Sequence, residues 1–368
     1  MLNIFCSPAR YVQGPDATRE LAHEMVRVGL TGRTLIIAGA SARAETESMW
    51  RESFGNQGTA FDVLEFGGEC SIPEIERGKT EARRTQAKSI VGAGGGKALD
   101  TARAVASELD LPVVCCPTVA ASDSPTSALS VVYSPGGVFE KYLFYKRNPD
   151  LVLVDTRVIA RAPVRFLIAG MGDALATWFE AETAHRAHKA NQVGGGSTLA
   201  AMAIAELCYK TLLNDGVSAV AAARAGAVTP SLERIVEANT LLSGLGFESG
   251  GLAVAHSVHN GLSVAAETHG CLHGEKVAFG TLVQLVLEGR ERHVLNEVMG
   301  FCRSVGLPVT LMELGIEKLS LEQARRIAEI AIAEGETSHN EPFPLTWQMV
   351  KDAIFAADQL GSAFSWTR

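Results

Sequence analysis

Four of the nine histidines in this chain lie in one short stretch, GGLAVAHSVHNGLSVAAETHGCLHGEKVAFG. They are His256, His259, His269 and His273. A neutral imidazole nitrogen is a good ligand for a borderline divalent ion such as zinc, so this clustering favours a metal site over unrelated surface or core rings. His256 and His259 are three positions apart and share a face of a predicted helix, while His273 follows an irregular stretch. We expect a helix and a loop to converge on one ion.

A carboxylate that could complete such a site is Asp173, in the apolar segment FLIAGMGDALATWFEAE. Taken alone, an aspartate after glycine most often caps a helix, and this one begins a predicted helical run that also carries Thr177 and Glu180 on the same face. Taken with the histidines, it fits a catalytic site of two histidines, one acid and an open position. The combination favours metal-assisted chemistry.

A glycine-rich turn lies in the segment SIVGAGGGKALDTARA, between a predicted strand and a predicted helix. Glycines there let backbone amides approach a diphosphate, and the start of a helix adds partial positive charge. The pattern differs from GxGxxG at Lys97 and from a P-loop at Ala98. A tight turn without a ligand is the alternative, and Lys97 favours the phosphate site.

A second loop, CPTVAASDSPTSALSVVY, is dense in hydroxyls and carries one acid, Asp123. Ligands of open parallel sheets bind beyond the carboxyl ends of the strands, where both loops are expected. The two loops could therefore face one ligand. The simpler interpretation is that Ser122, Asp123 and Pro125 are ordinary turn residues.

The composition limits the classes of protein that this chain can represent. Its 368 residues, 47% hydrophobic and 20% charged, predict a fully folded protein of two domains. A net charge of −8 without a Lys/Arg-rich run argues against a nucleic-acid partner. Seven scattered cysteines without a CxxC pair, and no basic leader or long apolar run, predict a cytoplasmic protein that does not bind membranes.

The hydrophobic patterns change along the chain. Short β-branched runs alternate with helical patterns up to about residue 160, which predicts parallel βαβ units over residues 1–162. Ala/Leu-rich helical patterns follow, which predicts an all-α domain over residues 163–368. The expected strands are 34–38, 60–66, 89–91, 113–116 and 151–154, and the expected helices include 197–213, 217–229, 231–245, 256–264, 277–287 and 321–333.

Several long segments together carry a family resemblance. GAGGGKALDTA, PTVAASDSPTSALSVVY, NPDLVLVDT, GMGDALATWFEA, ANTLLSGLGFESGGLAVAHSVHNGL, HGEKVAFGTLVQL and EGETSHN resemble the glycerol dehydrogenases of the iron-containing (group III) alcohol dehydrogenase superfamily. The resemblance runs from Ser7 to Leu360. It implies a dehydroquinate synthase-like fold, with a Rossmann-like domain followed by a helical domain, and a homo-oligomer. It also implies zinc-dependent oxidation of glycerol with hydride transfer to NAD.

By position, the resemblance also assigns residues. Asp173, His256 and His273 match the zinc ligands, which also bind the substrate. Asp123 matches the aspartate associated with substrate hydroxyls, and His259 is a candidate near the reacting carbon or in a proton path. The residues matching cofactor contacts are Gly94, Gly95, Gly96, Lys97, Asp100, Thr118, Ser127, Leu129 and Tyr133.

The chain departs from the family pattern in two places. Gly39-Ala40 stands where an acidic residue commonly holds the adenosine ribose, so we expect weak discrimination and NADP use beside NAD, with Ser41 and Arg43 available to a 2′-phosphate. The segment between the zinc histidines is one residue short, which makes His269 a competitor of His273.

Three other functions stay open. The first is a phosphorylated-substrate enzyme on the same fold, such as a glycerol-1-phosphate dehydrogenase or a dehydroquinate synthase-like lyase. Such an enzyme needs cations, and the metal segments offer little beyond Lys276. The second is a dehydrogenase of another polyol or hydroxy acid, and the third is a non-enzymatic metal- or nucleotide-binding relative.

Overall fold

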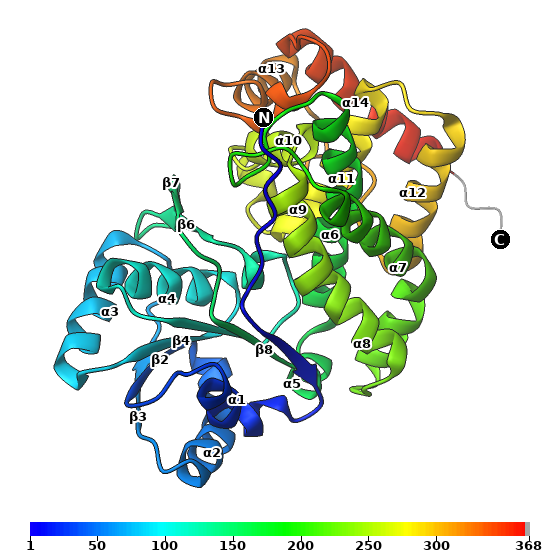
Figure 1. Cartoon of the computed structure of the whole chain (residues 1–368). Coiled ribbons are helices and arrows are strands. Elements are labelled where there is room, and N and C mark those ends of the chain that lie inside the picture. The colour runs from blue at the N-terminus through cyan, green and yellow to red at the C-terminus, as the bar shows by residue number, and fades with distance from the viewer. Residues whose placement is uncertain (365–368) are drawn as a thin grey trace. The chain divides into compact units, whose positions relative to one another are not determined.

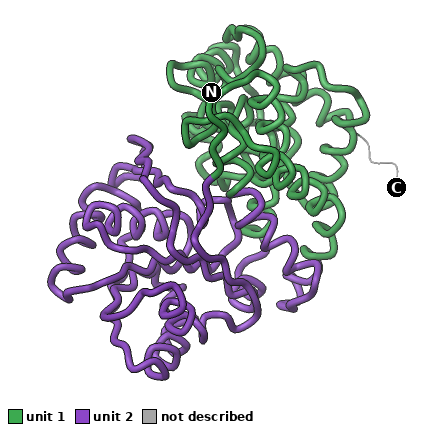
Figure 2. Tube along the Cα trace, viewed as in Figure 1, with its two compact units in different colours: residues 1–5, 165–220, 245–368 green, residues 6–164, 221–244 purple. Residues whose placement is uncertain are grey.

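The structure is a computed structural model and describes residues 1–364. The chain forms two compact units (Figure 2). A sheet unit comprises Cys6–Val164 and Ala221–Gly244, and a helical unit comprises Met1–Phe5, Arg165–Val220 and the chain from Leu245 onward. Among residues 1–364, no helix is both long and apolar enough to cross a membrane.

The two units do not follow a single division of the chain near residue 162. The amino terminus lies with the helical unit because Ile4 donates its N–H to the carbonyl of Gly196 at 3.0 Å. Segment 221–244 lies with the sheet unit, since the amide of Gln13 donates to the Glu233 carboxylate at 2.8 Å. Both segments are held in their units by hydrogen bonds between residues far apart in sequence.

Six strands form the central sheet in the order β1-β8-β5-β4-β2-β3, and every neighbouring pair is parallel. Figure 1 labels four of them, β2, β3, β4 and β8. The five strands expected from the sequence are confirmed. The short strand β1 was missed because its sequence, YVQG, contains no apolar run. The strands are β1 (Tyr11–Gly14), β2 (Thr34–Ala38), β3 (Phe61–Glu65), β4 (Ser89–Gly94), β5 (Val113–Pro117) and β8 (Leu151–Asp155).

Both faces of this sheet are covered, which explains the continuously apolar strands. Alternate residues of β2 enter different cores: Ile36 packs in a cluster with Trp50 of α2, and Ile37 in a cluster with Ile75 of α3. The helices of the sheet unit are α1 (Leu21–Arg27), α2 (Ala40–Asn56), α3 (Ile72–Thr85), α4 (Gly96–Leu109), α5 (Thr156–Arg161) and α8 (Pro230–Glu237), with the π-helix η3 (Ala238–Leu242). A separate antiparallel hairpin pairs β6 (Leu129–Tyr133) with β7 (Phe139–Phe144). The predicted fold class, a Rossmann-like parallel sheet followed by a helical region, is confirmed.

The helical unit differs from the sequence pattern at one long helix. The turn-forming residues around Gly216 predicted two helices, but α7 runs unbroken from Leu199 to Arg224. A Cβ at Gly216 would lie 2.8 Å from the Phe301 ring, so glycine permits a close helix contact here rather than a turn. The other helices are α6 (Val164–Arg186), α9 (Ser243–Gly250), α10 (Val254–Leu262), α11 (His273–Leu287), α12 (Arg292–Val305), α13 (Leu321–Ala331) and α14 (Trp347–Ala363).

Glycines bring three of these helices into backbone contact. A Cβ on Gly274 of α11 would lie 1.8 Å from the carbonyl oxygen of Ala169 in α6, and one on Gly172 would lie 2.3 Å from the carbonyl oxygen of Gly274. Further along α11, a Cβ on Gly280 would lie 2.3 Å from the carbonyl oxygen of Ala255 in α10. Such distances leave no room for any side chain, so α6, α10 and α11 can pack this closely only with glycine at these positions.

We expect Gly274→Ala to destabilise the protein, because the new methyl group must push α11 away from α6. Overpacking of this kind costs about 1–3 kcal/mol or more. Urea unfolding followed by far-ultraviolet circular dichroism measures the effect. Gly270→Ala is the matched control, since no atom lies within 4 Å of a Cβ built there. Equal unfolding midpoints for the two variants would show that the contact is not tight.

Candidate functional site

Asp173 lies in the middle of α6, which begins at Val164. The capping interpretation is therefore wrong, because an N-cap residue precedes its helix and Asp173 is a full helical residue. The expectation that the helical run begins at Asp173 is also wrong, since the apolar residues before it continue the same helix. The side chain is completely buried. A buried carboxylate needs a strong partner, and the neighbouring helices provide it.

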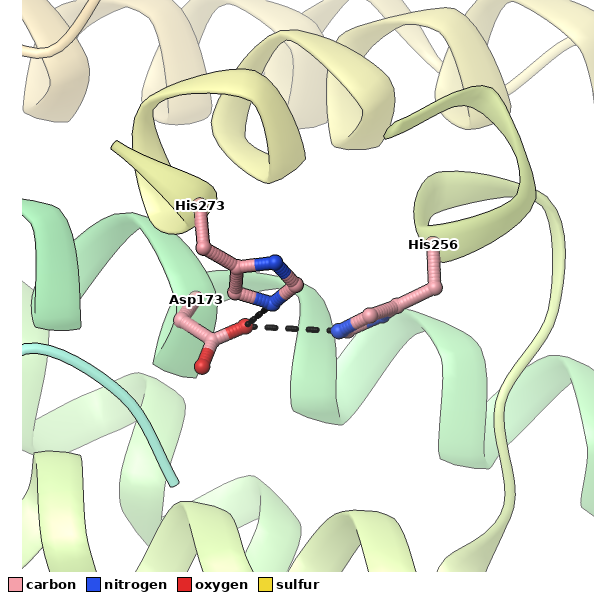
Figure 3. Close-up of side chains that lie close together, drawn as sticks. All are labelled: Asp173, His256 and His273. Carbon is pink, nitrogen blue, oxygen red and sulfur yellow. Dashed lines mark hydrogen bonds and ion pairs between the residues drawn. The ribbon is translucent and has the colours of Figure 1, made fainter. Parts of the chain in front are cut away.

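Two histidines converge on this carboxylate (Figure 3). The Nε2 atom of His273, the first residue of α11, lies 3.1 Å from Oδ1 of Asp173. The Nε2 atom of His256, on α10, lies 3.3 Å from the same oxygen. One ligand-type atom from each of the three residues lies within 4.8 Å of the others. The structure thus brings together the three residues that the sequence singled out.

A residue that the sequence analysis did not assign, Glu180, holds His256. One oxygen of its carboxylate lies 2.6 Å from Nδ1 of the ring. The other oxygen accepts hydrogen bonds from the backbone N–H groups of Ala253 and His256, at 2.9 and 3.0 Å. Glu180 lies two turns after Asp173 on the same face of α6, which is the pattern that could have identified it. Fully buried, it sits at the amino end of α10, where negative charge is favoured.

The bond to Glu180 determines what the other ring nitrogen can do. When Nδ1 donates its hydrogen to Glu180, Nε2 of neutral His256 is a bare acceptor that faces the Asp173 oxygen. Two acceptors at 3.3 Å repel each other unless a proton or a cation lies between them. An ion bound by both atoms removes that repulsion, so the donor set fits a divalent metal.

The second histidine is supported by a longer chain of polar groups. Nδ1 of His273 faces Nε2 of His259 at 3.0 Å, and Nδ1 of His259 faces the amide oxygen of Asn260 at 3.1 Å. Asn260 in turn donates to Glu336 at 3.0 Å. Burial, reinforced by His273, lowers the pKa of His259 well below its usual value, so this ring is neutral and can accept a hydrogen bond. Partners of this kind orient metal-ligating imidazoles.

The charge state of Asp173 also suits a ligand. Burial alone would raise the pKa of its carboxyl group, but His273 and His256 outweigh burial and bring the pKa well below its ordinary range. The carboxylate is therefore ionised at neutral pH. His269, the predicted competitor of His273, is exposed in the turn before α11 and does not belong to this cluster.

The sheet unit carries the glycine-rich turn at the carboxyl end of β4. Gly94 has φ of 148°, a conformation that other residues rarely adopt. At Gly95 and Gly96 the nearest atoms to an added Cβ lie 3.5 Å or farther away, at ordinary van der Waals distance, so no steric clash requires glycine at these two positions. Gly95 precedes α4 and provides no side-chain cap. A helix start whose N–H groups have no side-chain cap suits a phosphate.

The other predicted cofactor residues have different surroundings. Lys97 pairs with Glu69 at 2.6 Å, and its ammonium group lies 5.0 Å from the centre of the Tyr133 ring. Asp100 and Ser127 are buried and share one partner, the guanidinium of Arg103. Thr118 donates its N–H to the carbonyl of Gly94 at 3.0 Å, and Leu129 begins the hairpin strand β6. Asp100 and Ser127 thus anchor the second loop to α4, and the cofactor contacts remain predictions.

Asp123 lies in the second loop and is 9% exposed. The hydroxyl of Ser243, just after η3, donates to its Oδ2 at 3.4 Å. The loop is fixed against η3 by further bonds, including one from the amide of Asn239 to the carbonyl of Ala120 at 3.0 Å. A π-helix within a helical segment often marks a functional site. The position of Asp123 is thus set by residues more than a hundred positions away.

A parallel sheet with an open glycine-rich turn and a helical unit that offers two imidazoles and a carboxylate are typical of nucleotide- and metal-dependent enzymes. Comparison with known proteins identifies the class. Residues 8–156 match the family model described as iron-containing alcohol dehydrogenase. The chain belongs to the iron-containing alcohol dehydrogenase family, and it is an oxidoreductase that acts on CH–OH groups.

Individual relatives are similar over nearly their whole length. The glycerol dehydrogenase of Pseudomonas putida is 50% identical over 358 residues, which cover 97% of this chain and 98% of the relative. A glycolaldehyde reductase of Halobacterium salinarum is 48% identical, with 98% of each chain covered. The crystal structure of a probable glycerol dehydrogenase from Sinorhizobium meliloti superimposes with a TM-score of 0.93 at 41% identity, covering 98% of this chain and 100% of that one.

We predict that His273→Ala loses bound metal and turnover while keeping its fold, because one of three ligands is removed. Even outer partners of metal ligands contribute about 10–100-fold to affinity or activity, so a ligand contributes more. Metal content by mass spectrometry and circular dichroism measure the two effects. His269→Ala is the control and keeps both properties. Full metal content in His273→Ala would contradict the assignment.

Proposed function

We propose that this protein oxidises glycerol and related vicinal diols to hydroxyketones of the dihydroxyacetone type, with NAD as the hydride acceptor. The proposal rests on the cluster of Asp173, His256 and His273, found in a chain that is 50% identical in sequence to a glycerol dehydrogenase. The enzymatic class follows from the family. The substrate, the cofactor and the metal are the proposed part.

Zinc is the metal that we propose for the cluster. Asp173, His256 and His273 would hold it through one carboxylate oxygen and two Nε2 atoms, a set that also suits ferrous iron. When bound, zinc supplies a Lewis acid that lowers the pKa of a substrate hydroxyl. Glu180 accepts the Nδ1 hydrogen of His256 and so leaves Nε2 of the neutral ring to the metal, and His259 orients the ring of His273.

The dinucleotide residues are proposed from the glycine-rich turn. Gly94, Gly95 and Gly96 lead from β4 into α4, whose first N–H groups have no side-chain cap, and Lys97 adds a cation beside them. NAD, when bound, supplies the acceptor for the hydride. Thr118 follows β5 and bonds to Gly94, and Tyr133 ends β6 with its ring beside Lys97. Both residues are proposed to contact the same cofactor.

Asp123 is proposed to recognise a second hydroxyl of the diol. A carboxylate that is mostly buried can accept a strong hydrogen bond from an alcohol, and Ser243 already orients one of its oxygens. A phosphorylated substrate is less well supported. Lys276, the cation nearest to His273 in sequence, is 8% exposed and donates to Ser263 at 2.9 Å.

A second candidate function is reduction of a small hydroxyaldehyde. It is favoured by the 48% identity to a glycolaldehyde reductase over nearly the full length. Such a reduction would use the same groups in the reverse direction. We also propose a homo-oligomer, as the family resemblance implies, and a cytoplasmic location, supported by seven cysteines of which none forms a disulfide in the described structure.

The test is a panel of substrates with NAD and with NADP. Glycerol, 1,2-propanediol, 1,3-propanediol and ethanol are compared as alcohols, and glycolaldehyde as the substrate of the reverse reaction. The purified enzyme is assayed directly, after chelation, and after return of zinc or ferrous iron. We expect vicinal diols with NAD to be used best and zinc to restore activity. Activity unaffected by complete metal removal would contradict the proposal.

Replacement of Asp123 by alanine should raise the KM for glycerol without changing NAD affinity, because only a substrate contact is lost. A hydrogen bond to a charged group contributes about 1.5–3 kcal/mol, so the expected loss is about tenfold or more. Steady-state kinetics and NAD titration by calorimetry separate the two quantities. Asp123→Asn keeps the shape without the charge and should fall between wild type and Asp123→Ala. An unchanged KM in Asp123→Ala would show that Asp123 does not bind the substrate and is an ordinary turn residue.

A further inference from the structure

The carboxyl end of β2 lacks the acid that usually selects between NAD and NADP. Ala38 ends the strand and Gly39 follows it, with its N–H bonded to the carbonyl of Ala93 at 3.2 Å. From β2 the chain crosses through α2 to β3 on one side, and from β4 it crosses through α4 to β5 on the other side. Ligands of such sheets bind at the strand ends where the direction of crossing changes, here between β2 and β4. An acid here normally bonds the ribose hydroxyls and repels a 2′-phosphate. From the sequence alone, its absence predicted NADP use.

The neighbouring strand supplies a carboxylate at the same level. Glu65 is the last residue of β3, the edge strand, and the parallel register pairs it with Ala38. Phe66 then donates its N–H to the carbonyl of Ala38 at 2.8 Å, so the two strand ends stay together. Neighbouring strands lie about 4.8 Å apart, which places the carboxylate of Glu65 within reach of the missing acid's position. Its side chain is 62% exposed and can meet a ligand.

The cation expected to attract a 2′-phosphate is already engaged. Arg43 in the first turns of α2 donates through Nε to Glu47 at 2.7 Å, and its NH1 atom lies 3.9 Å from a carboxylate oxygen of Glu65. Glu47 also pairs with Arg51, and Arg77 lies close enough to Glu65 for an electrostatic interaction. A 2′-phosphate at this strand end would meet the carboxylate of Glu65 directly and would compete with Glu47 and Glu65 for Arg43. The expectation from sequence did not include either carboxylate.

We propose that Glu65 replaces the missing acid and makes the site selective for NAD over NADP, by repelling a 2′-phosphate and by holding Arg43. The residue that selects the cofactor thus comes from the strand beside the usual one. This inference rests on the proposed dinucleotide-binding function.

Calorimetric titration of the purified protein with NAD and with NADP, without polyol, tests the proposal. At an ionic strength of about 0.15 M, which leaves short-range repulsion measurable, we expect wild type to bind NAD roughly a hundredfold more tightly than NADP. Glu65→Gln should reduce that ratio about tenfold, mainly through tighter NADP binding. Adding Arg43→Ala to Glu65→Gln should weaken NADP again, because the released cation is removed.

The matched control is Asp62→Asn, which removes a charge near the other end of the same strand. Asp62 pairs with Arg33 at 2.7 Å, as Glu65 pairs with Arg43, and its loss should leave the ratio unchanged. Equal binding of NAD and NADP by wild type would overturn the role of Glu65, as would equal ratios for Glu65→Gln and Asp62→Asn. If wild type binds neither dinucleotide and is inactive with the substrate panel, the proposed function itself fails. NAD-linked activity with an unaltered ratio refutes only the role of Glu65.

Discussion

The backbone contact between α6 and α11 is the constraint on which the cluster of Asp173, His256 and His273 depends. Gly172 and Gly274 touch each other's helices, and the residues directly beside them are Asp173 and His273. The absence of two side chains therefore places a carboxylate and an imidazole 3.1 Å apart. Gly280 lets α11 approach α10 in the same way, at Ala255, which is the residue just before His256. Close packing and ligand convergence are here one physical requirement.

Electrostatics explains how so polar a cluster can form around a buried carboxylate. A lone ionised Asp173 in this apolar helix would be very costly, and each imidazole reduces that cost. Each ring in turn has its other nitrogen committed, to Glu180 or to His259. The hydrogen bonds thus direct both Nε2 atoms toward one oxygen. Burial lowers the pKa of His256, but Glu180 and Asp173 outweigh burial and raise it well above its usual value. Without a cation a proton therefore lies between Nε2 of His256 and Asp173, and a bound cation would take the place of that proton.

Local patterns predicted the parallel sheet and a histidine-rich metal site, and the family resemblance then singled out Asp173, His256 and His273. Strands buried on both faces are continuously apolar, and four histidines in one stretch are rare by chance. Prediction from sequence failed where tertiary contacts determine the local structure. The residues around Gly216 have the local signature of a turn, yet packing against Phe301 keeps α7 helical. Asp173 looked like a cap because the sequence does not show that the preceding apolar residues continue the helix.

The residues that support the cluster were harder to predict than Asp173, His256 and His273, since they lie far away in sequence. Glu336 reaches His259 only through Asn260, and no spacing rule connects a residue near the carboxyl terminus to α10. Glu65 was equally hard to predict, because strand pairing places it beside Ala38 although a whole helix separates the two residues in sequence. A parallel register places strand ends side by side whatever lies between them in sequence. A charge deleted from one strand end can therefore be supplied by its neighbour, and a motif read along a single strand will miss the replacement.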